Sequence, residues 1–177
     1  MEKILKNDLK GFEFFAKLPG TLGGMLAMNA GVKTYEIFNI LRAINIEGEW
    51  RDKADIEHGY RYAKLGGIAL EATFEKEKGF DNTLLDELIS LRKNQPKEPS
   101  AGSFFKNPKD DYAARLIEAC ELKGKQIGGM AWSAIHTNFL VNLNEGTFED
   151  ALKLINLAKE EVQKKFNINL EEEVKIL

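Results

Sequence analysis

Helix signals occur in five stretches of the chain. Over residues 81–93, apolar side chains recur at spacings of three and four, and Asp81 is in the N-cap position. Thr147 and Asp150 have the form of a capping box, with Asp in the place usual for Glu, ahead of the longest apolar stripe. The predicted helices cover residues 7–16, 21–28, 81–93, 112–122 and 147–166.

Strand signals lie between these helices. An alternating run over residues 40–46 ends at Glu47-Gly48-Glu49, which predicts a strand and a hairpin turn. Further strands are predicted over 65–74 and 138–142. Helices and strands are interleaved without a regular βαβ period, so we expect an α+β fold.

The end of the chain alternates in the manner of a strand. Over residues 168–176 the apolar side chains fall on even numbers, so a strand would turn them to one face. Glu171 and Glu173 would then point to the other face, where an exposed carboxylate is the usual outcome.

A charged stretch, residues 75–79, is the best candidate for a boundary between two subdomains. We therefore expect one segment over residues 1–77 and a second over 78–177. A chain of 177 residues is long enough for one large domain or two small ones.

Composition narrows the function classes. The net charge of −3 gives no broad electrostatic case for nucleic acid or an anionic membrane as a partner. The single cysteine, Cys120, excludes an internal disulfide framework, and with His58 and His136 it gives poor support for a metal site, so no metal is expected. The first residues are too charged for a signal peptide, and no apolar run approaches the roughly 20 residues of a membrane span. These features favour a cytoplasmic protein.

The segment Pro99–Pro108 has the chemistry of a rigid loop that presents a serine. The two prolines restrict the backbone at its ends, and Gly102 lets the main chain pass close to a neighbour just before Ser103. The alternative is an ordinary loop that Phe104 and Phe105 anchor to a core. Local chemistry alone favours that alternative.

A second candidate site is the glycine-rich stretch Leu18–Gly31. Thr21 can cap a short helix whose N-terminus is left bare by glycines, and such an end attracts phosphate. The spacing matches neither the dinucleotide fingerprint nor a Walker A loop. Glycines that serve tight helix packing are an equally good explanation.

Together these segments resemble the UDP-N-acetylenolpyruvoylglucosamine reductase (MurB) family. Pro19–Gly24 with Met28–Gly31 is similar to the family's flavin-phosphate loop, and Pro99–Pro108 is similar to its catalytic serine motif. Leu170–Val174 resembles its C-terminal carboxylate motif. Supporting matches, all in the family's order, are Gly59–Tyr62, Lys123–Gly129 and Ser133–Phe139.

The resemblance implies a partial FAD-binding domain followed by a substrate-binding α+β domain. It also implies an oxidoreductase in which NADPH and FAD serve to reduce UDP-N-acetylglucosamine enolpyruvate to UDP-N-acetylmuramate for peptidoglycan. In catalysis Ser103 would donate a proton, Arg61 would stabilise the enolate, and Glu173 would orient or polarise the enol intermediate. The other implied site residues are Tyr60, Lys106 and Asn107 for substrate, and Pro19, Gly20, Thr21, Gly23, Gly24, Asn29 and Gly31 for FAD.

The resemblance also implies a missing part. Family members carry a further N-terminal segment of the flavin domain, and nothing in this sequence matches it, so we expect a truncated or internally initiated chain. An incomplete sheet would leave an edge open to pairing with another copy. The alternative function is therefore a non-catalytic module that binds a UDP-sugar but lacks stable FAD.

Overall fold

Apolar side chains gather into separate cores in the computed structural model, which describes residues 4, 6–16 and 18–176. Backbone contacts divide the chain into a first unit, Met1–Lys93, and a second unit, Asn94–Leu177. Mixed helix and sheet in both units confirm the predicted α+β class. Among the described residues, no helix is both long and apolar enough to span a bilayer.

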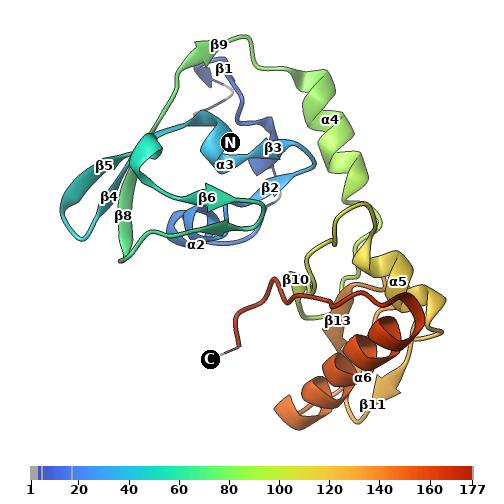
Figure 1. Cartoon of the computed structure of the whole chain (residues 1–177). Helices are drawn as coiled ribbons and strands as arrows, with labels where there is room; N and C mark the ends of the chain where they lie inside the picture. Colours follow the sequence, from blue (N-terminus) through green and yellow to red (C-terminus); the bar gives the residue numbers. More distant parts are fainter. Residues whose placement is uncertain (1–3, 5, 17, 177) are drawn as a thin grey trace. The chain divides into compact units, whose positions relative to one another are not determined.

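A three-stranded antiparallel sheet with the order β5-β4-β8 supports the first unit (Figure 1). Its central strand, β4, buries Ile44 and Ile46, and α2 packs on β8. The predicted strand and hairpin turn at residues 40–49 are confirmed. The elements of this unit are β1 (Leu9–Lys10), η1 (Glu13–Phe15), α2 (Leu22–Ala27), β2 (Gly31–Val32), β3 (Tyr35–Glu36), α3 (Ile37–Ile40), β4 (Leu41–Ile46), β5 (Glu49–Asp52), η2 (Lys53–Asp55), β6 (His58–Gly59), β7 (Tyr62–Ala63), β8 (Ala69–Phe74), β9 (Glu77–Lys78) and α4 (Asn82–Leu91).

The division between the units falls after Lys93, not at the charged stretch 75–79. Strand β9 pairs with β1, and α4 packs on η1 and buries Leu88 in the first core. The charge pattern was misleading because charged residues also suit a short exposed strand.

The predicted helix over residues 7–16 is replaced by β1, a turn and η1. Asp8 and Gly11 have positive φ angles of 53° and 87°, which a right-handed helix does not allow. The Asp8 carboxylate instead accepts hydrogen bonds from the backbone N–H groups of Gly79 and Phe80. Asp8, which was predicted as a possible helix cap, therefore links the start of the chain to residues 79–80.

The second unit has an antiparallel sheet with the order β10-β13-β12-β11. Helix α6 packs against β11, β12 and α5, and buries Leu154, Ala158 and Val162 (Figure 1). The predicted capping box at Thr147 and Asp150 is present at the start of α6. The elements are β10 (Ser100–Ser103), α5 (Ala113–Ala119), β11 (Gln126–Ile127), β12 (Met130–Trp132), β13 (Phe139–Asn142) and α6 (Phe148–Phe166).

The predicted strand over residues 168–176 is an extended segment with a single bridge, between Phe105 and Glu172. Leu170 is buried in the second core and Val174 packs against it, whereas Ile176 is 46% exposed. The alternation therefore predicts the inward-facing side chains for part of the segment. Among the described residues, its backbone pairs with residues 104–106 of the same chain.

Candidate functional sites in the two units

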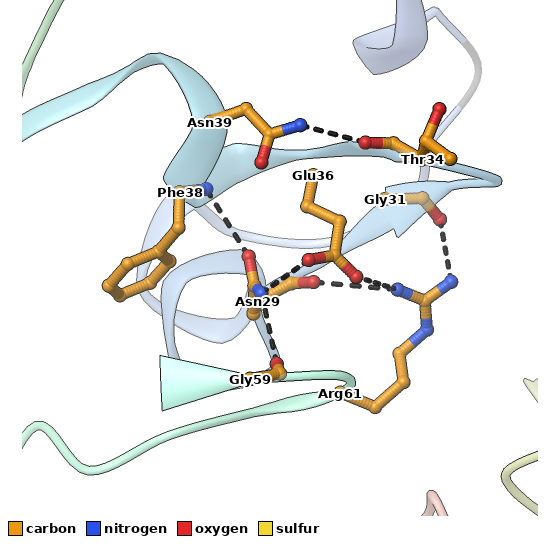
Figure 2. Close-up of polar contacts among 8 residues, drawn as sticks. All are labelled: Asn29, Gly31, Thr34, Glu36, Phe38, Asn39, Gly59 and Arg61. Atoms are coloured by element: carbon orange, nitrogen blue, oxygen red, sulfur yellow. Dashed lines mark hydrogen bonds and ion pairs between the residues drawn. The ribbon is translucent and has the colours of Figure 1, made fainter. Parts of the chain in front are cut away.

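The Arg61 side chain takes part in a network of polar contacts in the first unit (Figure 2). Arg61 lies in the two-residue loop between β6 and β7 and has a φ of 59°. Its Nη2 donates to the Gly31 carbonyl at 3.0 Å, and its Nη1 lies 3.4 Å from Oε1 of Glu36 and 3.5 Å from the Asn29 carbonyl. The guanidinium also lies over the Tyr60 ring, 4.9 Å from its centroid. The predicted catalytic arginine therefore contacts two of the predicted cofactor residues.

Both the nitrogen and the oxygen of the Asn29 side-chain amide form hydrogen bonds within the protein. Its Nδ2 donates to Oε2 of Glu36 at 2.8 Å and to the Gly59 carbonyl at 2.9 Å, and its Oδ1 accepts from the Phe38 N–H at 3.2 Å. The residue is 1% exposed. A side chain with these partners organises the loop that a ligand would meet.

The glycine-rich loop contains two kinds of glycine. Gly31 has no room for a side chain, because a Cβ there would lie 2.1 Å from the Tyr35 carbonyl oxygen across the β2–β3 hairpin. Gly20 is exposed, and a Cβ there would meet nothing within 4 Å. Thr21 caps α2 as predicted and accepts the Gly24 N–H at 3.2 Å. Residues 19–21 are therefore exposed, whereas Gly31 is needed for the close approach of β2 and β3.

Ser103 is held in the second unit by backbone pairing. It is the last residue of β10, pairs with Phe139 of β13, and follows a bulge at which Gly102 has a φ of 89°. Phe104 and Phe105 behind it are buried and stack edge to face at 5.0 Å. The structure thus combines the two interpretations of this loop: phenylalanines anchor it, and a half-buried serine precedes them.

Asn138 completes the backbone pairing of the serine loop. Its Oδ1 accepts the Phe105 N–H at 3.0 Å, and its Nδ2 donates to the Phe105 carbonyl at 2.7 Å. Its own carbonyl accepts the Phe104 N–H at 2.7 Å. One buried amide therefore takes the place of a peptide group in a neighbouring strand.

The C-terminal segment lies along the other edge of the serine loop. The Glu173 N–H donates to the Phe104 carbonyl at 2.8 Å, and the Lys106 N–H donates to the Glu171 carbonyl at 2.8 Å. The Lys106 ammonium pairs with the Glu171 carboxylate. Glu173 therefore lies opposite Phe104, the residue that follows Ser103.

Two further side chains support this region. The Asn107 Oδ1 accepts the Ala113 N–H at 3.1 Å at the start of α5. The Ser133 hydroxyl accepts the N–H groups of Ile135 and His136 and shapes the turn that delivers Asn138. Burial lowers the pKa of the His136 imidazole, whose buried Nδ1 has no hydrogen-bond partner among the described residues.

Sequence reasoning assigned no role to Glu36 or Asn138. Asn138 lies inside the matched segment Ser133–Phe139, so a signal for it was present. Glu36 follows the glycine-rich stretch by five residues and had no signal of its own, because only folding brings it to Arg61.

Comparisons with known proteins agree with both units. The model of the family described as "UDP-N-acetylenolpyruvoylglucosamine reductase, C-terminal domain" matches residues 95–177. Proteins named UDP-N-acetylenolpyruvoylglucosamine reductase are 52% identical over 97% of this chain in Helicobacter hepaticus, and 47% identical over 97% in Campylobacter jejuni. The chain spans 65% and 67% of their lengths.

A solved structure agrees with the fold. The crystal structure of UDP-N-acetylenolpyruvylglucosamine reductase (MurB) from Thermus caldophilus is 31% identical, with a TM-score of 0.85 over 98% of this chain and 66% of that one. Sequence and structure point the same way, and the chain belongs to the UDP-N-acetylenolpyruvoylglucosamine reductase family.

Proposed function

We propose that this protein takes part in the reduction of UDP-N-acetylglucosamine enolpyruvate to UDP-N-acetylmuramate for peptidoglycan synthesis. Family membership supports the reaction class, and the chain covers 65% of the relative from Helicobacter hepaticus. The observation that carries the proposal is the pairing of residues 104–106 with 171–173, because it gives Ser103 and Glu173 neighbouring positions on one scaffold.

Ser103 is the proposed proton donor. Hydride addition to the terminal vinyl carbon places an electron pair on the adjacent carbon, next to the substrate carboxylate. The Ser103 O–H bond then breaks, its proton forms the new C–H bond, and solvent returns a proton to the serine oxygen. A hydroxyl is a poor acid in water, so it must be held in place against the developing charge. The bulge at Gly102 and the buried Phe104 hold the backbone on both sides of Ser103.

Arg61 and Glu173 are the proposed charged partners in the reaction. The guanidinium of Arg61 would stabilise negative charge on the enolate, and Glu173 would orient the enol intermediate. Tyr60, under the Arg61 guanidinium, is 44% exposed and offers a ring and hydroxyl to substrate. Lys106 would bind substrate through its ammonium, whereas Asn107 supports the site by capping the start of α5.

The proposed place of FAD in the first unit is the start of α2. Pro19, Gly20 and Thr21 are exposed there, and the first N–H groups of a helix have no intrahelical acceptor. Backbone groups from Pro19 to Gly23 would hold a phosphate of FAD, while the Gly24 N–H binds Thr21. Asn29 and Gly31 would shape this loop from within. When bound, FAD supplies hydride transfer from NADPH to the enolpyruvyl group.

The second candidate function is a binding module that holds a UDP-sugar without FAD or turnover. The match of the family's C-terminal domain model to residues 95–177, within the second unit, supports it. A separate proposal concerns association between copies of the chain. Strand β8 lies at one edge of the sheet β5-β4-β8, and Leu70 in this strand and Ile68 just before it are exposed. We also propose that this edge pairs with another copy. Sedimentation over a range of protein concentrations tests that pairing.

The experiment that separates the two functions starts from the purified chain mixed with FAD. Flavin absorbance of the protein after gel filtration measures retention, and NADPH oxidation on addition of UDP-N-acetylglucosamine enolpyruvate measures turnover. Retained flavin with substrate-dependent oxidation supports the reductase. A colourless protein that binds UDP-N-acetylglucosamine in calorimetry, with no NADPH oxidation, supports the binding module instead.

A further inference from the structure

Glu36 joins the two groups of predicted functional residues in the first unit. One oxygen of its carboxylate, Oε2, accepts the Asn29 amide at 2.8 Å, and the other, Oε1, lies 3.4 Å from the Arg61 guanidinium (Figure 2). Only 14% of the Arg61 side chain and 20% of the Glu36 side chain are exposed. Charges so far removed from water interact more strongly than an ion pair on the surface.

Arg61 adopts a left-handed backbone conformation in the turn between β6 and β7. A φ of 59° at a residue other than glycine costs about 1–2 kcal/mol. A glycine in this two-residue loop would avoid that cost. The turn holds the Arg61 guanidinium against the Gly31 and Asn29 carbonyls and the Glu36 carboxylate.

The network around Glu36 ties together three segments that are distant in sequence. Asn29 contacts Gly59 on β6 and Phe38 on α3, while Arg61 contacts Gly31 on β2. The Glu36 carboxylate accepts from both the Asn29 amide and the Arg61 guanidinium. Removing its charge would leave two donors, the amide and the guanidinium, competing for one acceptor.

We propose that Glu36 is a positioning residue for Arg61. Its carboxylate sets the place of the guanidinium and links it to the Asn29 loop, so that the loop and the arginine move as one. The role rests on the proposed function, because Arg61 acts on substrate only if the chain serves in the reductase reaction. Glu36 itself touches neither substrate nor cofactor.

The test is Glu36→Gln, which keeps the size and shape of the side chain. Its amide has only one oxygen, so either the Asn29 amide or the Arg61 guanidinium would face an N–H donor instead of an acceptor. In the 177-residue chain without ligands, hydrogen exchange of the Arg61 Nη1 protons, which face Glu36, should become about ten times faster when followed by low-temperature NMR. In FAD-loaded protein, the step in which substrate oxidises the reduced enzyme should slow about 10- to 100-fold, as expected when a reacting group is misplaced. Reduction by NADPH should stay within about twofold, because Arg61 has no role in it.

The matched control is Glu57→Gln. Glu57 pairs with Lys64 beside the same hairpin, but with 59% and 68% of the two side chains exposed. An exposed pair contributes little, so Arg61 exchange and substrate oxidation should stay within about twofold. In an Arg61→Lys background, Glu36→Gln should cause little further loss, because the two changes remove one interaction.

The outcomes separate the two proposals. If Arg61→Lys slows the substrate step while Glu36→Gln changes neither that step nor Arg61 exchange, the role of Glu36 is overturned and the proposed function stands. If Arg61→Lys leaves the substrate step unchanged, the proposed catalytic role of Arg61 is wrong, and so is the positioning role of Glu36. Should Glu36→Gln fail to fold, Glu36→Asp keeps the charge but is one methylene shorter; an unchanged Arg61 exchange in that variant also overturns the proposal.

Discussion

Arg61 and Ser103 are held in their units by different kinds of contact. Arg61 is fixed through its side chain, by two carbonyl groups and the Glu36 carboxylate. Ser103 is fixed through its backbone, by strand pairing on one side and by the extended C-terminal segment next to Phe104 on the other. Side-chain contacts therefore hold the proposed charged group, whereas backbone contacts hold the proposed proton donor.

This difference predicts two kinds of mutational effect. Changes at Arg61 should alter the substrate step more than stability, because the turn of Tyr60 and Arg61 is not part of the apolar core of the first unit. Changes around Ser103 should alter stability and the substrate step together, because the same backbone contacts serve both.

The largest loss of stability is expected from Asn138→Ala. This change leaves the buried Phe105 N–H and carbonyl without partners and should lower the free energy of unfolding of the second unit by about 2–4 kcal/mol. Urea unfolding measures it through the fluorescence of buried Trp132, in a Trp50→Phe background.

The control for that change is Asn142→Ala. Asn142 is the last residue of β13, which begins directly after Asn138. The change removes a single hydrogen bond, from the Gly146 N–H to Oδ1, and should cost about 1 kcal/mol. Equal losses in the two variants would mean that Asn138 does not clamp the serine loop.

A smaller loss is expected from Gly31→Ala. A Cβ would lie 2.1 Å from the Tyr35 carbonyl oxygen and 2.8 Å from the Glu36 Cα, so β2 and β3 must separate and carry Glu36 with them. We expect a loss of about 1–3 kcal/mol in the first unit, measured by thermal unfolding, together with faster Arg61 exchange. Gly24→Ala, whose Cβ would be 3.4 Å from Thr21 Oγ1, should change stability by no more than about 1 kcal/mol.

Gly102→Ala should act through backbone strain alone. A Cβ at this position meets nothing within 4 Å, but a φ of 89° is unfavourable for alanine. The expected cost is about 1 kcal/mol, read from the same Trp132 signal, with a slower substrate step because Ser103 follows directly. An unchanged rate with reduced stability would show that the serine tolerates movement of its loop.

The smallest effect is a pH dependence at His136. Burial lowers the pKa of its imidazole from the ordinary 6.5, so the folded state binds a proton less readily than the unfolded state. The stability contribution is fully present above pH 6.5 and is lost as the pH falls below it toward the folded pKa. Unfolding of the second unit at pH 7.5 and pH 5.5 should differ more for the wild type than for His136→Gln. If the stability difference between pH 7.5 and pH 5.5 is the same in both proteins, His136 is not the cause of the pH dependence.

Local signals were sufficient for much of the fold. The capping box at Thr147 and the apolar stripe that follows set both ends of α6, and Asp81 caps α4 as expected. Such elements are predictable because the residues that stabilise them lie within a few positions of one another. The C-terminal segment was harder, since alternation fixes which side chains face inward but not whether a neighbouring strand exists.

The candidate site shows the same limit. Ser103, Arg61 and Glu173 could be selected because the motifs around them resemble a known family. Glu36 had no signal of its own, and its contact with Arg61 spans 25 residues. Asn138 lies inside a matched motif, but its contact with Phe105, 33 residues away, could not be predicted from that motif. The side chains that hold a site depend on tertiary contacts, which the sequence alone does not reveal.

The most direct test of the account is a stopped-flow measurement on Ser103→Ala in FAD-loaded protein, with Ser100→Ala as the control in the same strand. Reduction by NADPH should remain within about twofold of the wild type, because no proton from Ser103 is needed. Oxidation of the reduced enzyme by UDP-N-acetylglucosamine enolpyruvate should slow by about 10²- to 10⁴-fold, the usual contribution of a general acid. If that second step stays fast in Ser103→Ala, Ser103 is not the proton donor and the proposed mechanism is wrong.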